Sequence, residues 1–196
     1  MASEFFKGHD YFIDEKVNFF KFENVYNVFN ETGENIGAVK QRLTFGQKML
    51  RLFVGKPMLP FKLEIVNTDD QVQATISRGW TFFMSKIVVN DANGGELAVI
   101  KQKFKLFKPT FRIEEPNGSL IAEIAGDWKA WEFTIKDSNI GGIGTISKKW
   151  GGAMREVFTS ADKYNVHIDP TYNNNTKKVA ILSAAITIDM VLKNQK

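Results

Sequence analysis

The 196-residue sequence contains no cysteine. Disulfide bonds, thiolate nucleophiles, cysteine-ligated zinc sites and palmitoylation are therefore excluded. Proline occurs 5 times and glycine 15 times, which excludes collagen-like and low-complexity chains. Aromatic residues make up 13% of the chain, with 17 phenylalanines, so the sequence is too rich in apolar side chains for a disordered protein. We expect one globular domain over residues 1–196.

Long hydrophobic runs are also scarce. The first ten residues lack the apolar core of a signal peptide, so a cytoplasmic location is expected, with the inner membrane surface as a further option. The longest apolar run, residues 179–192, is interrupted by Asp189 and is shorter than the ~20 residues that a spanning helix needs. This length is typical of a buried core helix.

Basic residues are unevenly distributed. The net charge of +4 is too small to indicate a nucleic-acid-binding protein, and we expect no nucleic-acid partner. However, residues 40–62 and 101–112 contain several Lys and Arg and no acidic residue. Such stretches suit anionic phospholipid head groups, although a solvated strand face is the simpler alternative. The predicted lipid-binding residues are Lys40, Arg42, Lys48, Arg51, Lys101, Lys103 and Lys105.

Short apolar segments recur along the chain, separated by turns containing Asn, Asp or Gly. These residues tolerate the positive φ that tight hairpin turns require. Segments such as 131–136 alternate between apolar and polar residues, which is typical of strands with one buried face. The sequence therefore predicts an antiparallel meander, in which 25–30 pairs with 36–43, 61–66 with 72–78, 87–90 with 97–103, 111–114 with 120–125, and 131–136 with 143–150.

The C-terminal run predicts a helix over about 176–193, with Asn175 or Thr176 as its N-cap. This helix would be apolar around almost its whole circumference and must therefore be surrounded. A closed meander of about twelve strands has an interior too wide for side chains alone to fill. We therefore predict a mainly β protein, a closed antiparallel barrel around a hydrophobic C-terminal helix. Residues 47–54 could form a shorter helix, which would plug the barrel or anchor it to a membrane surface.

Residues with catalytic potential form no recognisable pattern. The two histidines, His9 and His167, are far apart in the sequence. Nucleophile elbows, phosphate-binding loops, zinc-binding helices and dinucleotide-binding glycine patterns do not occur. His167 lies in an alternating segment, which favours an ordinary strand histidine over a general base. The sequence predicts no catalytic residue and no enzyme.

Residues 144–164, GTISKKWGGAMREVFTSADKY, are followed by the apolar run ending in Ile188-Asp189. This region closely resembles the C-terminal signature of phospholipid scramblases: a Gly-x-Ile-x-Lys-x-Trp strand, an Arg-Glu-x-Phe-Thr-x-Ala-Asp segment, an aromatic strand and a helix containing Ile-Asp. The resemblance implies the Tubby/LURP-one-like fold, a twelve-stranded barrel enclosing a hydrophobic helix. It also implies binding of anionic phospholipid at a membrane surface, with phospholipid scrambling as a further activity.

The resemblance also raises the question of calcium. The family's calcium segment begins with Asp, whereas here Ser160 stands first and Thr171 occupies the twelfth place. Asp162 and Asp169 remain as weak candidate ligands, and one or two carboxylates do not supply the six to eight oxygens that calcium takes. We expect no cofactor. An alternative function remains open, a soluble barrel that binds a small ligand or a protein partner and has no membrane role.

Overall fold

The computed structural model describes residues 4–18, 23–42, 60–80, 86–103, 109–149 and 163–193. Its elements are one short 3-10 helix, a set of antiparallel strands and a C-terminal helix. Their bounds are η1 Glu4–Phe6, β1 Asp10–Asn18, β2 Glu23–Phe29, β3 Asn35–Arg42, β4 Phe61–Asn67, β5 Val72–Arg78, β6 Lys86–Asp91, β7 Glu96–Lys103, β8 Thr110–Glu114, β9 Leu120–Asp127, β10 Glu132–Asp137, β11 Gly141–Ser147, β12 Lys163–Ile168 and α3 Asn175–Lys193.

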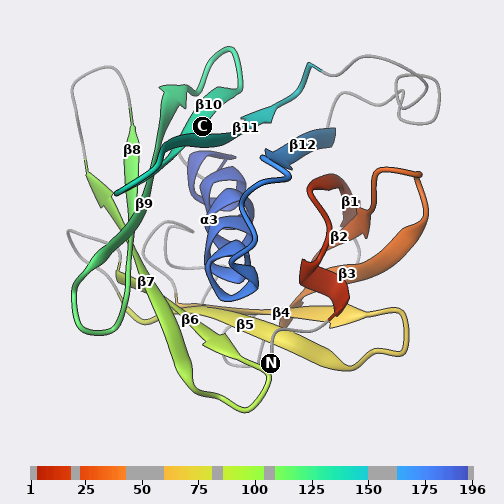
Figure 1. Cartoon of the computed structure of the whole chain (residues 1–196). Coiled ribbons are helices and arrows are strands. Elements are labelled where there is room, and N and C mark those ends of the chain that lie inside the picture. The colour runs from red at the N-terminus through yellow and green to blue at the C-terminus, as the bar shows by residue number, and fades with distance from the viewer. Residues whose placement is uncertain are drawn as a thin grey trace.

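The twelve strands form one closed barrel in which each strand pairs with its neighbours in the sequence (Figure 1). The ring closes where β12 pairs antiparallel with β1, and Tyr11 lies opposite Val166. The predicted antiparallel barrel and all of the predicted strand pairings are confirmed. The predicted short helix at residues 47–54 lies outside the described residues.

Four of the hairpin turns share one geometry. In the β2–β3 turn, Asn30 N–H donates to the Glu34 carbonyl over 3.0 Å, and Asn30 Oδ1 accepts from the N–H groups of Thr32 and Glu34. The fourth turn residue has positive φ in each case, and three of the four are glycines; the exception is Asp70, with φ 63°. These turns insert one extra residue, which explains the register shift in each hairpin.

The helix α3 lies inside the barrel, surrounded by strands (Figure 1). Every residue from Val179 to Leu192 is buried, including Asp189, which has no exposed surface. The helix starts at Asn175, one residue before the predicted start, and its cap differs from the prediction, because Asn174 Oδ1 accepts from the Lys177 N–H at 3.0 Å. Among the described residues, no helix has the length and hydrophobicity needed to cross a membrane.

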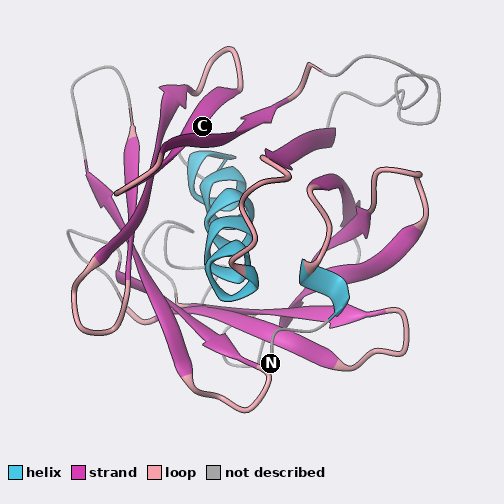
Figure 2. Cartoon of the chain, in the orientation of Figure 1, coloured by secondary structure: helices cyan, strands magenta, loops and turns pink. Residues whose placement is uncertain are grey.

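The interior is lined by the inward faces of the strands. Phe111 and Phe133 are buried inside the barrel. The two ends of the barrel differ. We call the end that carries the hairpin turns 30–34, 68–71, 92–95, 115–119 and 138–140 the turn end; Figure 2 draws these turns in pink. The N-terminus of α3 lies at this end, because Lys178 contacts Gly8 and Lys177 contacts Asp137.

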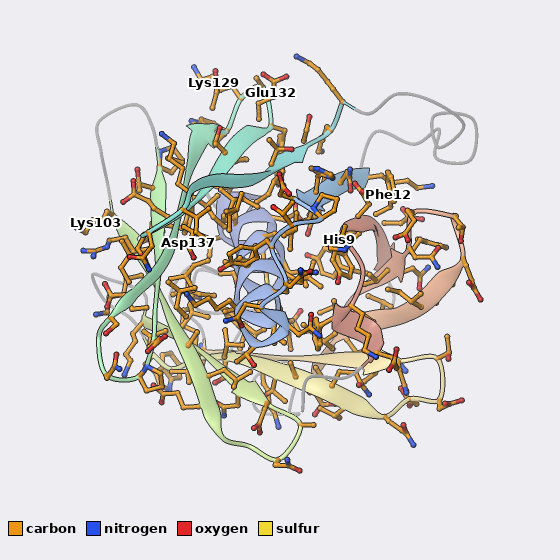
Figure 3. All side chains as sticks on the ribbon, viewed as in Figure 1. His9, Phe12, Lys103, Lys129, Glu132 and Asp137 are labelled. Atoms are coloured by element: carbon orange, nitrogen blue, oxygen red, sulfur yellow. The ribbon has the colours of Figure 1, made fainter. Side chains whose placement is uncertain are left out.

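Asp137, labelled in Figure 3, lies at the end of β10 and contacts residues at and just before the start of α3. Its carboxylate accepts hydrogen bonds from the Tyr172 hydroxyl at 2.9 Å and the Asn139 N–H at 2.8 Å, and Lys177 Nζ lies 3.6 Å away. Burial by itself raises the pKa of Asp137, but these hydrogen bonds and the nearby charge of Lys177 hold it below the ordinary value.

We expect Asp137→Asn to lower the free energy of unfolding at pH 7 by about 1.5–3 kcal/mol, since hydrogen bonds to a buried charged group are lost. A depressed carboxyl pKa stabilises the fold above the unfolded pKa of about 4, and this contribution disappears as pH falls through the folded pKa. Urea denaturation from pH 7 down to pH 3 should therefore show the difference from wild type shrinking. Asp127→Asn is the control, because Asp127 caps a similar but exposed turn and should matter little.

Candidate lipid-binding surface

Three cations stand side by side on the outer wall of the barrel. In the strand register Lys86 on β6 lies opposite Lys101 on β7, and Lys101 lies opposite Arg112 on β8. Lys103 ends β7 and is exposed, as are Lys86 and Lys101 (Figure 3 labels Lys103 on the outer edge of the ring). We call Lys86, Lys101, Lys103 and Arg112 the basic patch.

One carboxylate partly neutralises the basic patch. Glu114 Oε2 lies 2.5 Å from Lys101 Nζ, and Glu114 Oε1 lies 3.6 Å from Arg112 Nε. Neither Lys86 nor Lys103 forms an ion pair with any other residue that the structure describes. Like charges directly opposite each other destabilise a sheet, and Glu114 offsets this repulsion between Lys101 and Arg112.

The predicted residues on β3 have a different environment. Lys40 Nζ lies 2.5 Å from Asp70 Oδ1, and Arg42 Nε donates to Glu64 Oε2 at 2.8 Å. The Lys40 ammonium, through its hydrogen bond and its charge, lowers the pKa of Asp70. The stretch 40–62 is free of acidic residues in sequence, but β4 and its turn bring carboxylates beside it.

The structure therefore does not bring the predicted residues together in one place. Lys101 and Lys103 lie on β7, while Lys40 and Arg42 lie on β3, and β4, β5 and β6 stand between them. Lys48, Arg51 and Lys105 lie outside the described residues. Lys86 is not recognisable from the sequence, because an isolated lysine gives no signal until the hairpin register places it opposite Lys101.

Asp169, a candidate calcium ligand, is engaged within its own turn. Asp169 Oδ1 accepts from the Thr171 hydroxyl at 2.7 Å and the Thr171 N–H at 2.8 Å. These two hydrogen bonds, the hydroxyl first, lower the pKa of Asp169. Within the described ranges, no three His, Asp or Glu side chains are arranged to hold a metal ion, and Asp162 lies outside them. Asp169 with its present neighbours does not fit a calcium site.

Both histidines lie at the turn end, in contact with neighbouring polar groups. His167 Nδ1 is 3.0 Å from Asp10 Oδ1, which also accepts from Asn165 Nδ2 at 2.9 Å. His9 Nδ1 is 3.3 Å from the ammonium of the buried Lys178, and Figure 3 shows His9 close to the helix. These contacts tie β1, β12 and α3 together, as expected for structural histidines.

A cleft of about 550 Å³ opens at the turn end, between η1 and the β2–β3 and β4–β5 turns. Glu4, Asp10 and Glu31 line it together with Phe5 and Tyr11. Burial, followed by the charges of Glu31 and Asp10, raises the pKa of the Tyr11 hydroxyl. This negative environment does not suit a phosphate group, so the cleft and the basic patch differ in the ligands that they fit.

The model of the scramblase family matches residues 14–194, almost the whole chain. The chain belongs to the scramblase family. Among curated scramblase-family relatives, human phospholipid scramblase family member 5 is 25% identical over 183 residues, covering 86% of this chain and 65% of that protein. A phospholipid scramblase family protein of Schizosaccharomyces pombe is 19% identical over 176 residues, covering 83% of this chain and 45% of its own length.

The fold is also shared with a solved structure. A crystal structure of an Arabidopsis thaliana protein is similar with a TM-score of 0.53 and 8% sequence identity, over 96% of this chain and 93% of that one. The likeness shows that the two chains share the same barrel fold. Scramblase-family proteins are not typical enzymes. The chain spans less than two thirds of the length of each curated relative above.

Proposed function

We propose that this scramblase-family protein binds anionic phospholipid head groups at a membrane surface through the basic patch. The observation that carries this proposal is the row of Lys86, Lys101 and Arg112, in which each cation lies directly opposite the next and Glu114 pairs only with Lys101 and Arg112. The cytoplasmic leaflet is the proposed location, because it carries most of the anionic lipid.

The expected strength of the contact follows from the charges. A basic residue near an anionic membrane contributes about 1 kcal/mol to binding. At 0.1 M salt this attraction is largely screened beyond about 10 Å. Lys86 and Lys103 lack ion pairs with described residues, so each is expected to contribute this full binding free energy. Lys40 and Arg42 are proposed as weaker contributors, because binding lipid would compete with Asp70 and Glu64. Lys48, Arg51 and Lys105 stay predicted contributors.

We expect the double variant Lys86→Gln/Lys103→Gln to bind phosphatidylserine vesicles about 30-fold more weakly at low salt, which corresponds to about 2 kcal/mol. Cosedimentation with vesicles that contain or lack phosphatidylserine measures this. The control is Lys7→Gln/Lys136→Gln, which removes the same net charge from exposed positions outside the patch. Equal losses in both variants would mean that net charge alone, and not the basic patch, determines binding.

Lipid binding in this proposal uses the barrel as it stands. The helix α3 stays enclosed, since its residues from Val179 to Leu192 are buried in the described structure. Phospholipid scrambling is a further proposal supported by family membership, and movement of fluorescent lipid between the leaflets of reconstituted vesicles is its test. Vesicles that bind the protein without lipid movement would restrict its function to binding.

The second candidate function is binding of a small ligand without any membrane role, and the cleft at the turn end favours it. Its volume of about 550 Å³ is in the range of small-molecule sites, and its carboxylates suit a cationic ligand. If this is the function, the folded protein should not bind phosphatidylserine vesicles at low salt. If the protein cosediments with vesicles only when they contain phosphatidylserine, a function without any membrane role is excluded.

A further inference from the structure

The described tryptophans all lie at the end of the barrel opposite the turn end. Trp80 lies two residues after the last residue of β5, Arg78, and Trp128 and Trp131 lie in the connection from β9 to β10. Trp80 is 55% exposed, one of two exposed large hydrophobic residues in the described chain. We call this end, defined by Trp80, Trp128 and Trp131, the tryptophan end.

Lysines accompany these tryptophans. Lys148 Nζ lies 4.8 Å from the centre of the Trp131 ring, and Lys129 Nζ lies 6.0 Å from that of Trp128. Lys149 is exposed and pairs with Glu132 at 2.7 Å; Figure 3 shows Lys129 and Glu132 together on the outer edge. The described residues between strands at this end, 60, 79–80, 109, 128–131 and 148–149, include no Asp or Glu, although the strand ends there carry Asp127 and Glu132. Tryptophan beside lysine is the composition of membrane-interface anchors.

The turn end has the opposite charge. The segments between strands there, 30–34, 68–71, 92–95, 115–119 and 138–140, and residues 169–174 before the helix contain no Lys or Arg. They carry the acidic residues Glu31, Glu34, Asp69, Asp70, Glu115 and Asp169. An anionic membrane would therefore attract one end of the barrel and repel the other, which orients the molecule before contact.

The basic patch reaches the tryptophan end. Lys86 is the first residue of β6 and Lys103 is the last residue of β7, so both lie where the strands meet this rim. One flat bilayer surface can therefore contact both the cations, which attract head groups, and the Trp80 indole, which fits between head groups. A side-on contact through the strand faces would leave Trp80 in water.

We propose that the barrel docks end-on, with the tryptophan end against an anionic bilayer and Trp80 inserted among the head groups. The inference rests on the proposed function and adds the orientation and the depth of contact. The partner is a lipid surface, because the exposed indole beside cations needs an apolar region as well as phosphates. The acidic cleft at the turn end then faces away from the membrane.

The absence of cysteine makes a direct test available. Trp80→Cys and Ile140→Cys each create a single labelling site for an environment-sensitive fluorophore on the otherwise intact chain. Ile140 is the matched control, because it is 71% exposed and lies in the β10–β11 turn at the opposite end. Each labelled protein is mixed with phosphatidylcholine vesicles with and without phosphatidylserine, and circular dichroism checks the fold.

With phosphatidylserine, the label at position 80 should brighten, shift to the blue and be quenched by spin-labelled lipid, while the label at 140 stays unchanged. Trp80→Ala should also weaken vesicle binding at least about fivefold, and Ile140→Ala should not. If the protein cosediments with these vesicles but the label at 80 is unaffected, or the label at 140 responds too, end-on docking is wrong and head-group binding stands. If no phosphatidylserine-dependent cosedimentation occurs at low salt, both proposals fail.

Discussion

Replacing Ile181 with aspartate is expected to abolish the folded barrel. Ile181 has no exposed surface and lies in the part of α3 that the strands enclose. The substitution removes a packed side chain, which alone costs about 2–5 kcal/mol, and places a carboxylate where water does not reach. The sum exceeds about 5 kcal/mol, comparable with the total stability of many domains. Circular dichroism and thermal unfolding would show a chain without a cooperative transition.

Thr176→Asp is the matched control for this experiment. It introduces the same residue into the same helix, at an exposed position in the first turn. A negative charge near a helix N-terminus is favourable by about 0.3–1 kcal/mol, so stability should stay equal or rise slightly. A well-folded Ile181→Asp protein would mean that α3 can leave the barrel, and the burial described above would then be wrong.

The substitution Gly144→Ala is expected to cost about 3 kcal/mol. A Cβ atom at Gly144 would stand 2.1 Å from the His167 carbonyl oxygen and 3.2 Å from the Ile168 Cα, both in the backbone of β12. This close approach matters for closure of the ring, because Ile168 N–H also donates to the His9 carbonyl at 2.7 Å and Asp169 N–H to that of Ile143 at 2.8 Å. An added methyl group must push β12 away from β11.

Gly142 provides the control on the same strand. A Cβ atom built there meets nothing within 4 Å, and the residue is exposed. Gly142→Ala should therefore leave the free energy of unfolding unchanged or raise it by up to about 1 kcal/mol, since alanine restricts the unfolded chain. Urea denaturation of both variants measures the contrast. Equal effects at the two positions would argue against a close β11–β12 approach.

Local chemistry explains why the fold could be predicted. Turn residues such as Asn30 and Gly33 form their turn through contacts within five consecutive residues. The alternation of buried and exposed residues in a strand such as 132–137 is visible in its amino-acid sequence. The helix was predicted from its length and its uniform hydrophobicity, and its position followed because no other place could bury it. The predicted cap, Asn175 or Thr176, lies one or two residues after the observed one, since Asn174, Asn175 and Thr176 are all capable of capping and only geometry selects among them.

The candidate site was harder to predict, because it depends on contacts between distant parts of the chain. The order of residues is enough to show that two stretches are basic and free of acidic residues. Which of these cations pair with carboxylates of the same chain depends on the folded barrel. Strand pairing brings Glu64 and Asp70 to Arg42 and Lys40, yet sets Lys86, Lys101 and Arg112 in one row. Electrostatic attraction acts through space, so the register of the strands, and not the order of residues, determines the charge that each face of the barrel presents.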